Sequence, residues 1–220
     1  MSISDKIINF IQNRRLKVKK NYPGEFGRFF KDGGMDTLLS HVKINEKSNV
    51  VDVGAFKGEF AEKILLKFGS NLVLLEPLIN EFNILEKKFF LNKKIKLINK
   101  ALSNHNKKAN LLNDTNNSLI TNKKSSNVIE VDCLDVKNLF DEEIEINLIK
   151  LNVEGSEYDI IEKLIDLKYL TKCKNYLIQF HHKNNKEFYE RKKNIEKNFI
   201  EYKFLKVASY EYVWELWILK

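Results

Sequence analysis

From Asn49 onward the chain alternates short apolar runs with amphipathic segments, and this alternation restricts the fold more than any other feature. The apolar runs predict strands, at residues 50–53, 72–75, 95–99, 146–151 and 176–180. Apolar residues at helical spacing predict helices between and after them, at 59–68, 80–90, around 160–165 and at 187–202. Runs this continuous are typical of strands that are buried on both faces of a parallel sheet.

The last two apolar runs, at 204–208 and 213–219, are separated only by a short Ser-Tyr-Glu turn and predict a terminal β-hairpin. Between Lys107 and Asp135 the helical period is lost, and only 109–112 and 128–131 resemble strands. Residues 1–45 contain two helical patterns, the second at 35–42. We therefore expect a helical cap segment at 1–45 and one main domain at 46–220.

Composition excludes several classes of protein. Apolar residues make up 43% of the 220 residues, as in ordinary globular proteins, and no run is long enough to span a membrane. Only two cysteines occur, Cys133 and Cys173, and no Cys/His spacing typical of a metal site is present. We expect both cysteines to be small buried residues. The N-terminus lacks the apolar stretch of a signal peptide, so we expect a cytoplasmic protein.

The net charge of +8 comes from 34 lysines and only four arginines among 38 basic residues. Arginine is the residue that base readout and bidentate phosphate contacts favour. Abundant lysine, asparagine and isoleucine are also what an A/T-rich genome produces. The charge therefore argues against a nucleic-acid partner, although attraction to an anionic substrate stays open.

The most informative motif is a strand followed by Asp52-Val-Gly54-Ala55-Phe56-Lys-Gly58 and then a helix. Gly54 permits a sharp turn at the strand end, and Gly58 permits close packing or close approach of a ligand. In open α/β sheets, ligands lie across the carboxyl ends of the strands at such a turn. The pyrophosphate fingerprint G-x-G-x-x-G is broken by Phe56, and Asp52 suits a cationic amino-acid group better than a phosphate.

Glu76-Pro77 ends the second predicted strand, about twenty residues after the glycine turn. A carboxylate at this offset can accept hydrogen bonds from both hydroxyls of a ribose. Pro77 ends the strand and orients the loop that follows. Together with the turn, this dipeptide predicts a nucleoside-containing cofactor.

A polar cluster follows the strand at 146–151, in the segment Asn152-Val-Glu154-Gly-Ser-Glu157. Carboxylates and an amide in this place could position an acceptor hydroxyl and receive its proton. The acidic residues could equally favour the start of the next helix through its dipole. His181 and His182 end the next strand at the same sheet edge, and histidine is the usual general base near neutral pH. Alternation places these two side chains on opposite faces, so we expect one of them to reach the substrate.

Together these segments resemble the FkbM-type methyltransferases. The resemblance runs from about residue 49 to 182 and rests on five motifs in order: Asp52-Val-Gly-Ala-x-x-Gly58, Glu76-Pro77, Ala101-Leu102-Ser103, Leu134-Asp135 and Ile149-Lys150-x-Asn152-Val-Glu154-Gly-x-Glu157. It implies a class I methyltransferase, Rossmann-like α/β fold. The expected sheet is mostly parallel and seven-stranded, with helices on both faces and a C-terminal antiparallel hairpin.

The resemblance also implies S-adenosyl-L-methionine as cofactor and a small hydroxylated acceptor, such as a sugar, a polysaccharide precursor or a natural product. It assigns no metal. The residues that it implies for cofactor binding are Asp52, Gly54, Ala55, Phe56, Gly58, Glu76, Pro77, Leu102 and Ser103. The residues expected at the reacting centre are Asn152, Glu154, His181 and His182.

Two positions depart from the family pattern. Asn152 stands where the family usually has Asp, and Gln179-Phe180 precedes His181 where a Glu is usual. The missing charge at Asn152 weakens a metal-ligand or general-base role there. Three alternatives therefore stay open: an RNA or protein methyltransferase, a cofactor-binding protein without catalysis, and a dinucleotide or nucleotide-sugar oxidoreductase, which Phe56 disfavours.

Overall fold

The computed structural model describes residues 24–112, 128–140 and 145–220. Its main element is a seven-stranded sheet with the strand order β3-β2-β1-β7-β8-β10-β9. The strands are β1 (Asn49–Val53), β2 (Asn71–Leu75), β3 (Ile95–Ile98), β7 (Leu148–Leu151), β8 (Asn175–Ile178), β9 (Phe204–Tyr210) and β10 (Trp214–Leu219). Strands β3, β2, β1, β7 and β8 pair in parallel, and β10 runs antiparallel to both β8 and β9. The predicted sheet and hairpin are confirmed.

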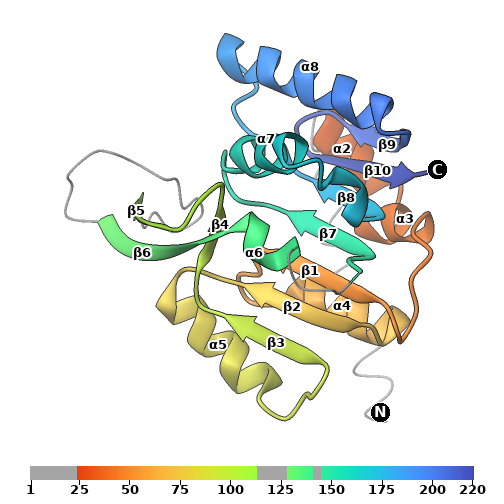
Figure 1. Cartoon of the computed structure of the whole chain (residues 1–220). Coiled ribbons are helices and arrows are strands. Elements are labelled where there is room, and N and C mark those ends of the chain that lie inside the picture. Colours follow the sequence, from red (N-terminus) through yellow and green to blue (C-terminus); the bar gives the residue numbers. More distant parts are fainter. Residues whose placement is uncertain (1–23, 113–127, 141–144) are drawn as a thin grey trace.

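Helices cover both faces of this sheet (Figure 1). One face packs against α2 (Gly24–Lys31), α3 (Met35–Ser40), α4 (Glu59–Phe68) and α5 (Ile79–Phe89). The other packs against α6 (Val136–Phe140), α7 (Glu157–Asp166) and α8 (Lys186–Glu201), with the short 3-10 helix η1 (Leu170–Lys172) leading into β8. Alternate residues along each strand supply the two cores, because successive side chains point to opposite faces.

A small second sheet was not expected from the sequence. It has the order β4-β6-β5, from β4 (Ala101–Ser103), β5 (Lys107–Leu112) and β6 (Val128–Asp135). β4 follows directly after β3, so this sheet extends from the carboxyl edge of the main sheet, as Figure 1 shows. It pairs the Leu102-Ser103 segment with Leu134-Asp135, two motifs that lie far apart in the sequence.

The two cysteines are buried and free, as expected. Within the described residues, no helix combines the length and apolar character that crossing a membrane requires. Of the expected cap segment, residues 1–23 lie outside the described part, and α2 and α3 pack on the same core as α4 and α5. The division at residue 45 stays a proposal.

Candidate active site

The turn after β1 is held against the end of β2 by its own backbone. The amides of Gly54 and Ala55 both donate to the carbonyl of Leu75, each at 3.0 Å. Gly54 has φ 76°, and a Cβ there would lie 2.1 Å from the backbone oxygen of Asn152. Glycine is therefore required because the end of β7 crosses the turn, rather than because of a ligand. At Gly58 a Cβ would meet Phe89 and Leu85, so that glycine permits packing on α5.

We expect Gly54→Ala to destabilise the fold by about 2–4 kcal/mol, because it combines a left-handed alanine with a backbone overlap. Urea unfolding of the purified variant measures this loss. Gly69→Ala is the matched control: Gly69 also has a positive φ, 64°, but its nearest heavy atom would be Glu46 Cβ at 3.7 Å. Equal losses in the two variants would contradict the proposed overlap with Asn152.

Glu76 lies at the end of β2 and braces the same turn. Its Oε2 accepts a hydrogen bond from the amide of Phe56 at 2.8 Å, and its Oε1 accepts one from the amide of Leu78 at 3.0 Å. Burial raises the pKa of the Glu76 carboxyl, and these two hydrogen bonds oppose that rise. Each carboxylate oxygen can accept a second hydrogen bond. The chemistry of Glu76 therefore fits a ribose diol, and the ribose role stays a prediction.

Asp52 has no exposure, so its carboxylate is enclosed by protein. Its Oδ1 lies 2.8 Å from Nζ of Lys150, the residue opposite it on β7. Direct contact between Asp52 and the cationic end of a cofactor, as the sequence suggested, is blocked in this structure by that pairing. The influence of Asp52 on a ligand passes through Lys150 and the turn.

The remaining cofactor predictions differ in how they face the solvent. Phe56 is 49% exposed and stands at the tip of the turn. Pro77 is half-buried, and its carbonyl accepts a hydrogen bond from Nδ2 of Asn99 at 3.1 Å. Leu102 and Ser103 are buried in β4, at 1% and 2% exposure. Contact of these last two side chains with a cofactor stays a prediction that requires some movement of β4.

Three non-glycine residues at this edge adopt left-handed backbone conformations. Phe56 has φ 49°, Glu154 has φ 51° and His182 has φ 62°, after β1, β7 and β8 respectively. Such conformations cost of order 1–3 kcal/mol each and cluster at functional sites. The carboxyl edge of the sheet therefore combines the sequence motifs with stored backbone strain.

The loop after β7 and the end of β8 meet in a charged cluster. His181 Nε2 lies 3.4 Å from Glu154 Oε2, and His181 Nδ1 lies 3.2 Å from Glu157 Oε1. Glu157 is fully buried and also accepts hydrogen bonds from the amides of Gly155 and His181, both at 2.8 Å. Glu157 therefore ties the two loops together, while Glu154 keeps 23% of its side chain exposed. The structure brings Glu154 and His181 together, as the motifs suggested.

Burial lowers the pKa of His181, but its hydrogen bonds to Glu154 and Glu157 outweigh this effect and raise the pKa to about 9. His181 is therefore an imidazolium at neutral pH and has no free nitrogen to accept a proton. A histidine base was one of the two expectations from the sequence. The geometry instead makes His181 the cation that orients the Glu154 carboxylate.

A pH prediction follows from this shift. Because the folded-state pKa of about 9 exceeds the ordinary value of 6.5, the imidazolium stabilises the fold fully below pH 6.5. This contribution, about 2–3 kcal/mol, is lost as the pH rises through 9. The free energy of unfolding should thus fall between pH 6.5 and 9. His181→Gln should abolish this fall, whereas His41→Gln, at an exposed histidine, should leave it intact; an unchanged slope in His181→Gln would contradict the assignment.

His182 does not join the carboxylate cluster. Its ring packs on Phe188, with centroids 4.4 Å apart, and it lies so close to Gly155 that a Cβ there would be 2.3 Å from Nε2. Asn152 lies between the two loops, and its buried Oδ1 accepts no hydrogen bond from the described residues. Asn152 therefore offers a ligand donor an unused acceptor atom, while contact of His182 with a substrate stays a prediction.

These motifs, their order and their spacing are those of a recognised domain: residues 52–212 match the description methyltransferase FkbM domain. The chain belongs to the FkbM methyltransferase family. As an FkbM methyltransferase, it uses S-adenosylmethionine as its methyl donor. A search among curated proteins found no match.

Solved structures share this fold. The FkbM methyltransferase of Methylobacillus flagellatus KT aligns with 13% identity and a TM-score of 0.56, over 81% of this chain and 45% of that one. The putative tRNA (m1A22) methyltransferase Sp1610 of Streptococcus pneumoniae, in complex with S-adenosyl-L-methionine, aligns with 14% identity and a TM-score of 0.49, over 84% and 71%. Precorrin-6y C5,15-methyltransferase of Geobacter metallireducens GS-15 aligns with 10% identity and a TM-score of 0.48, over 92% of both chains.

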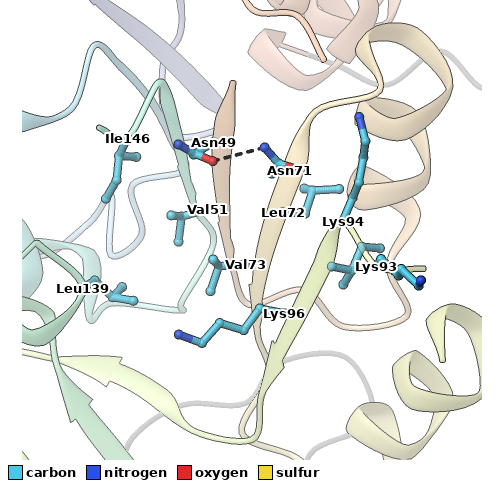
Figure 2. Close-up of a pocket in the computed structure, with 11 residues that line it drawn as sticks. Asn49, Val51, Asn71, Leu72, Val73, Lys93, Lys94, Lys96, Leu139 and Ile146 are labelled. Carbon is cyan, nitrogen blue, oxygen red and sulfur yellow. Dashed lines mark hydrogen bonds between the residues drawn. The ribbon is translucent and has the colours of Figure 1, made fainter. Parts of the chain in front are cut away.

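A cavity of about 220 Å³ lies at the opposite edge of the FkbM domain, where β1, β2 and β3 begin. Figure 2 shows Asn49 and Asn71 joined by a hydrogen bond beside it, with Val51 and Val73 along its floor. Small-molecule sites usually occupy roughly 300–1,000 Å³ and, in such sheets, the carboxyl edge. This cavity is smaller and lies at the amino edge, so we do not assign the cofactor to it.

Sequence reasoning missed two residues that shape the FkbM site. Lys150 was seen only as part of a motif, although its place opposite Asp52 follows from aligning the two parallel strands. Tyr158 is fully buried, and its hydroxyl donates to the carbonyl of His181 at 2.7 Å. Only its helical register could have indicated that it reaches the end of β8.

Proposed function

We propose that this FkbM methyltransferase transfers the methyl group of S-adenosylmethionine to a hydroxyl oxygen of a small acceptor, such as a sugar or a natural product. One observation carries the proposal: a partly exposed carboxylate, Glu154, is held by the His181 imidazolium at the carboxyl end of β7. A hydroxyl must lose its proton when its oxygen is methylated, and a positioned carboxylate can receive that proton.

The cofactor would lie across the carboxyl ends of β1 and β2, as ligands do in open α/β sheets. Glu76 has lone pairs for a ribose diol, and the turn at Gly54–Gly58 and the acceptor atom of Asn152 border the same region. When bound, S-adenosylmethionine supplies an electrophilic methyl group. No geometry beyond these protein contacts enters the proposal.

The protein's own groups divide the remaining work. His181 donates toward Glu154 Oε2, which leaves Oε1 of Glu154 without a hydrogen bond from the described residues. That oxygen would take the acceptor proton. Glu157 and Tyr158 fix His181 from behind, through its ring, its amide and its carbonyl. Positioning of this kind accounts for much of the rate that an enzyme gains when it holds two reactants near contact.

Two measurements test the proposal. Isothermal titration with S-adenosylhomocysteine and with NAD should give binding of the first only. Transfer of labelled methyl groups should then reach hydroxylated sugars or natural products and not RNA or protein. Labelling of RNA with a strong salt dependence would instead favour the nucleic-acid alternative, and binding of NAD alone would reject the cofactor.

A further inference from the structure

Lys150 is a charged residue in the middle of a strand that is buried on both faces. It is only 5% exposed, and its neighbours in β7 are buried apolar residues. In the parallel pairing of β1 and β7 it lies directly opposite Asp52, which has no exposure. Two opposite charges are thus enclosed on the face that α4 covers, next to the ring of Phe60, 5.9 Å from Nζ.

The ammonium of Lys150 makes three polar contacts. Nζ lies 2.8 Å from Asp52 Oδ1, donates to the carbonyl of Gly54 at 2.8 Å and approaches the carbonyl of Val53 at 3.4 Å. An ammonium has three hydrogens, so these contacts satisfy it. Two of the three partners are backbone atoms at the start of the glycine turn.

Stability alone does not account for such a pair. Moving two charges out of water is costly, and a buried ion pair can often be replaced by well-packed apolar residues without loss of stability. What an apolar pair could not do is donate to the carbonyls of Gly54 and Val53. Those carbonyls fix the direction in which the turn leaves β1, and the carbonyl of Gly54 keeps a second lone pair.

We propose that Lys150 is a positioning residue for the cofactor: its ammonium neutralises Asp52 and holds the Gly54 carbonyl in the orientation that receives the cofactor's amino-acid end. This inference rests on the cofactor site described under the proposed function. It reassigns the acidic residue of the motif, because Asp52 orients Lys150 and does not contact the ligand. The site then offers the cofactor a backbone oxygen in place of a free carboxylate.

Two variants separate this role from direct contact by Asp52. Asp52→Asn keeps an oxygen for Lys150 and leaves the lysine donating to Gly54, so affinity for S-adenosylhomocysteine should stay within about three-fold of wild type. Asp52→Asn/Lys150→Met removes the donor and leaves no buried charge. Its affinity for S-adenosylhomocysteine should fall about ten-fold or more, since a charge-assisted hydrogen bond to the turn is lost.

A second buried pair provides the matched control. Lys192 Nζ lies 2.7 Å from Glu215 Oε1 between α8 and β10, with side-chain exposures of 8% and 1%. Glu215→Gln/Lys192→Met carries the same chemical change in another part of the domain and should leave the affinity unchanged. Circular dichroism and thermal unfolding confirm folding in every case. Asp52→Asn/Lys150→Gln, whose shorter amide cannot reach Gly54, is measured in parallel in case the methionine variant does not fold.

The outcomes are distinct. Unchanged affinity in both folded double variants at positions 52 and 150 would overturn the inference and leave Lys150 a structural residue. A large loss in Asp52→Asn alone would also overturn it, in favour of direct contact by the carboxylate. Absence of S-adenosylhomocysteine binding by the wild-type protein would instead reject the proposed function. In variants that still turn over, KM for the cofactor should rise while KM for the acceptor stays constant.

Discussion

Lys150→Met is expected to lower the free energy of unfolding by about 3–5 kcal/mol, because it leaves the Asp52 carboxylate buried without its cation. Asp52 has no exposure, and Lys150 Nζ is the positive charge that lies 2.8 Å from it. Urea unfolding monitored by circular dichroism measures the change. The methionine side chain keeps most of the volume of lysine, so a large loss would reflect charge rather than a cavity.

The companion variant Asp52→Asn/Lys150→Met serves as the control for this prediction. It removes both charges and should recover most of the stability that the single change loses, since removing a complete buried pair is often neutral. A single variant that unfolds within about 1 kcal/mol of wild type would show that the pair contributes little, because breaking a buried pair normally costs far more.

Glu154→Gln is expected to reduce turnover by about 10²–10⁴-fold, the range usual for loss of a general base. Glutamine keeps the shape of the side chain and a hydrogen-bond acceptor for His181, but it cannot take a proton at neutral pH. Affinity for S-adenosylhomocysteine should remain within about two-fold, because Glu154 lies on the β7 loop rather than on the cofactor turn. Initial rates with the identified acceptor, together with isothermal titration, measure both quantities.

Glu190→Gln is the matched control for the loss of turnover. Glu190 lies on the exposed surface of α8, with 60% side-chain exposure, and its only ion pair is a 4.0 Å contact with Lys193. This change should leave turnover intact. If Glu154→Gln reduced the rate less than about three-fold, Glu154 would not be the general base, because such a residue contributes far more.

The main sheet could be predicted because its strands and helices each carry a strong local pattern. The helix at 59–68 was predicted with the same bounds that the structure has, since glycines flank it and its apolar residues repeat at helical spacing. β4 and α6 were missed because three and five residues are too few to establish a period. α2 was missed because the glycines around it suggested turns, although it buries Phe29 beside Tyr210.

The location of the site could also be predicted, because the carboxyl ends of parallel strands meet at one edge. Glu154 and His181 do meet there. What local sequence could not supply were the contacts that depend on alignment between strands, namely Asp52 with Lys150, and Gly54 with the carbonyl of Asn152. For the same reason the charge state of His181 could not be foreseen, since it arises from two carboxylates on a neighbouring loop.

The contact between Gly54 and Asn152 has one more consequence. The carbonyl of Asn152 occupies the space of a missing side chain at Gly54, and the amide of Asn152 donates to Val53 at 3.2 Å. The half of the enzyme that grips the methyl donor and the half that handles the recipient therefore share a single backbone junction. A shift on one side displaces the other, so mutations that retune recipient preference should alter donor affinity as well.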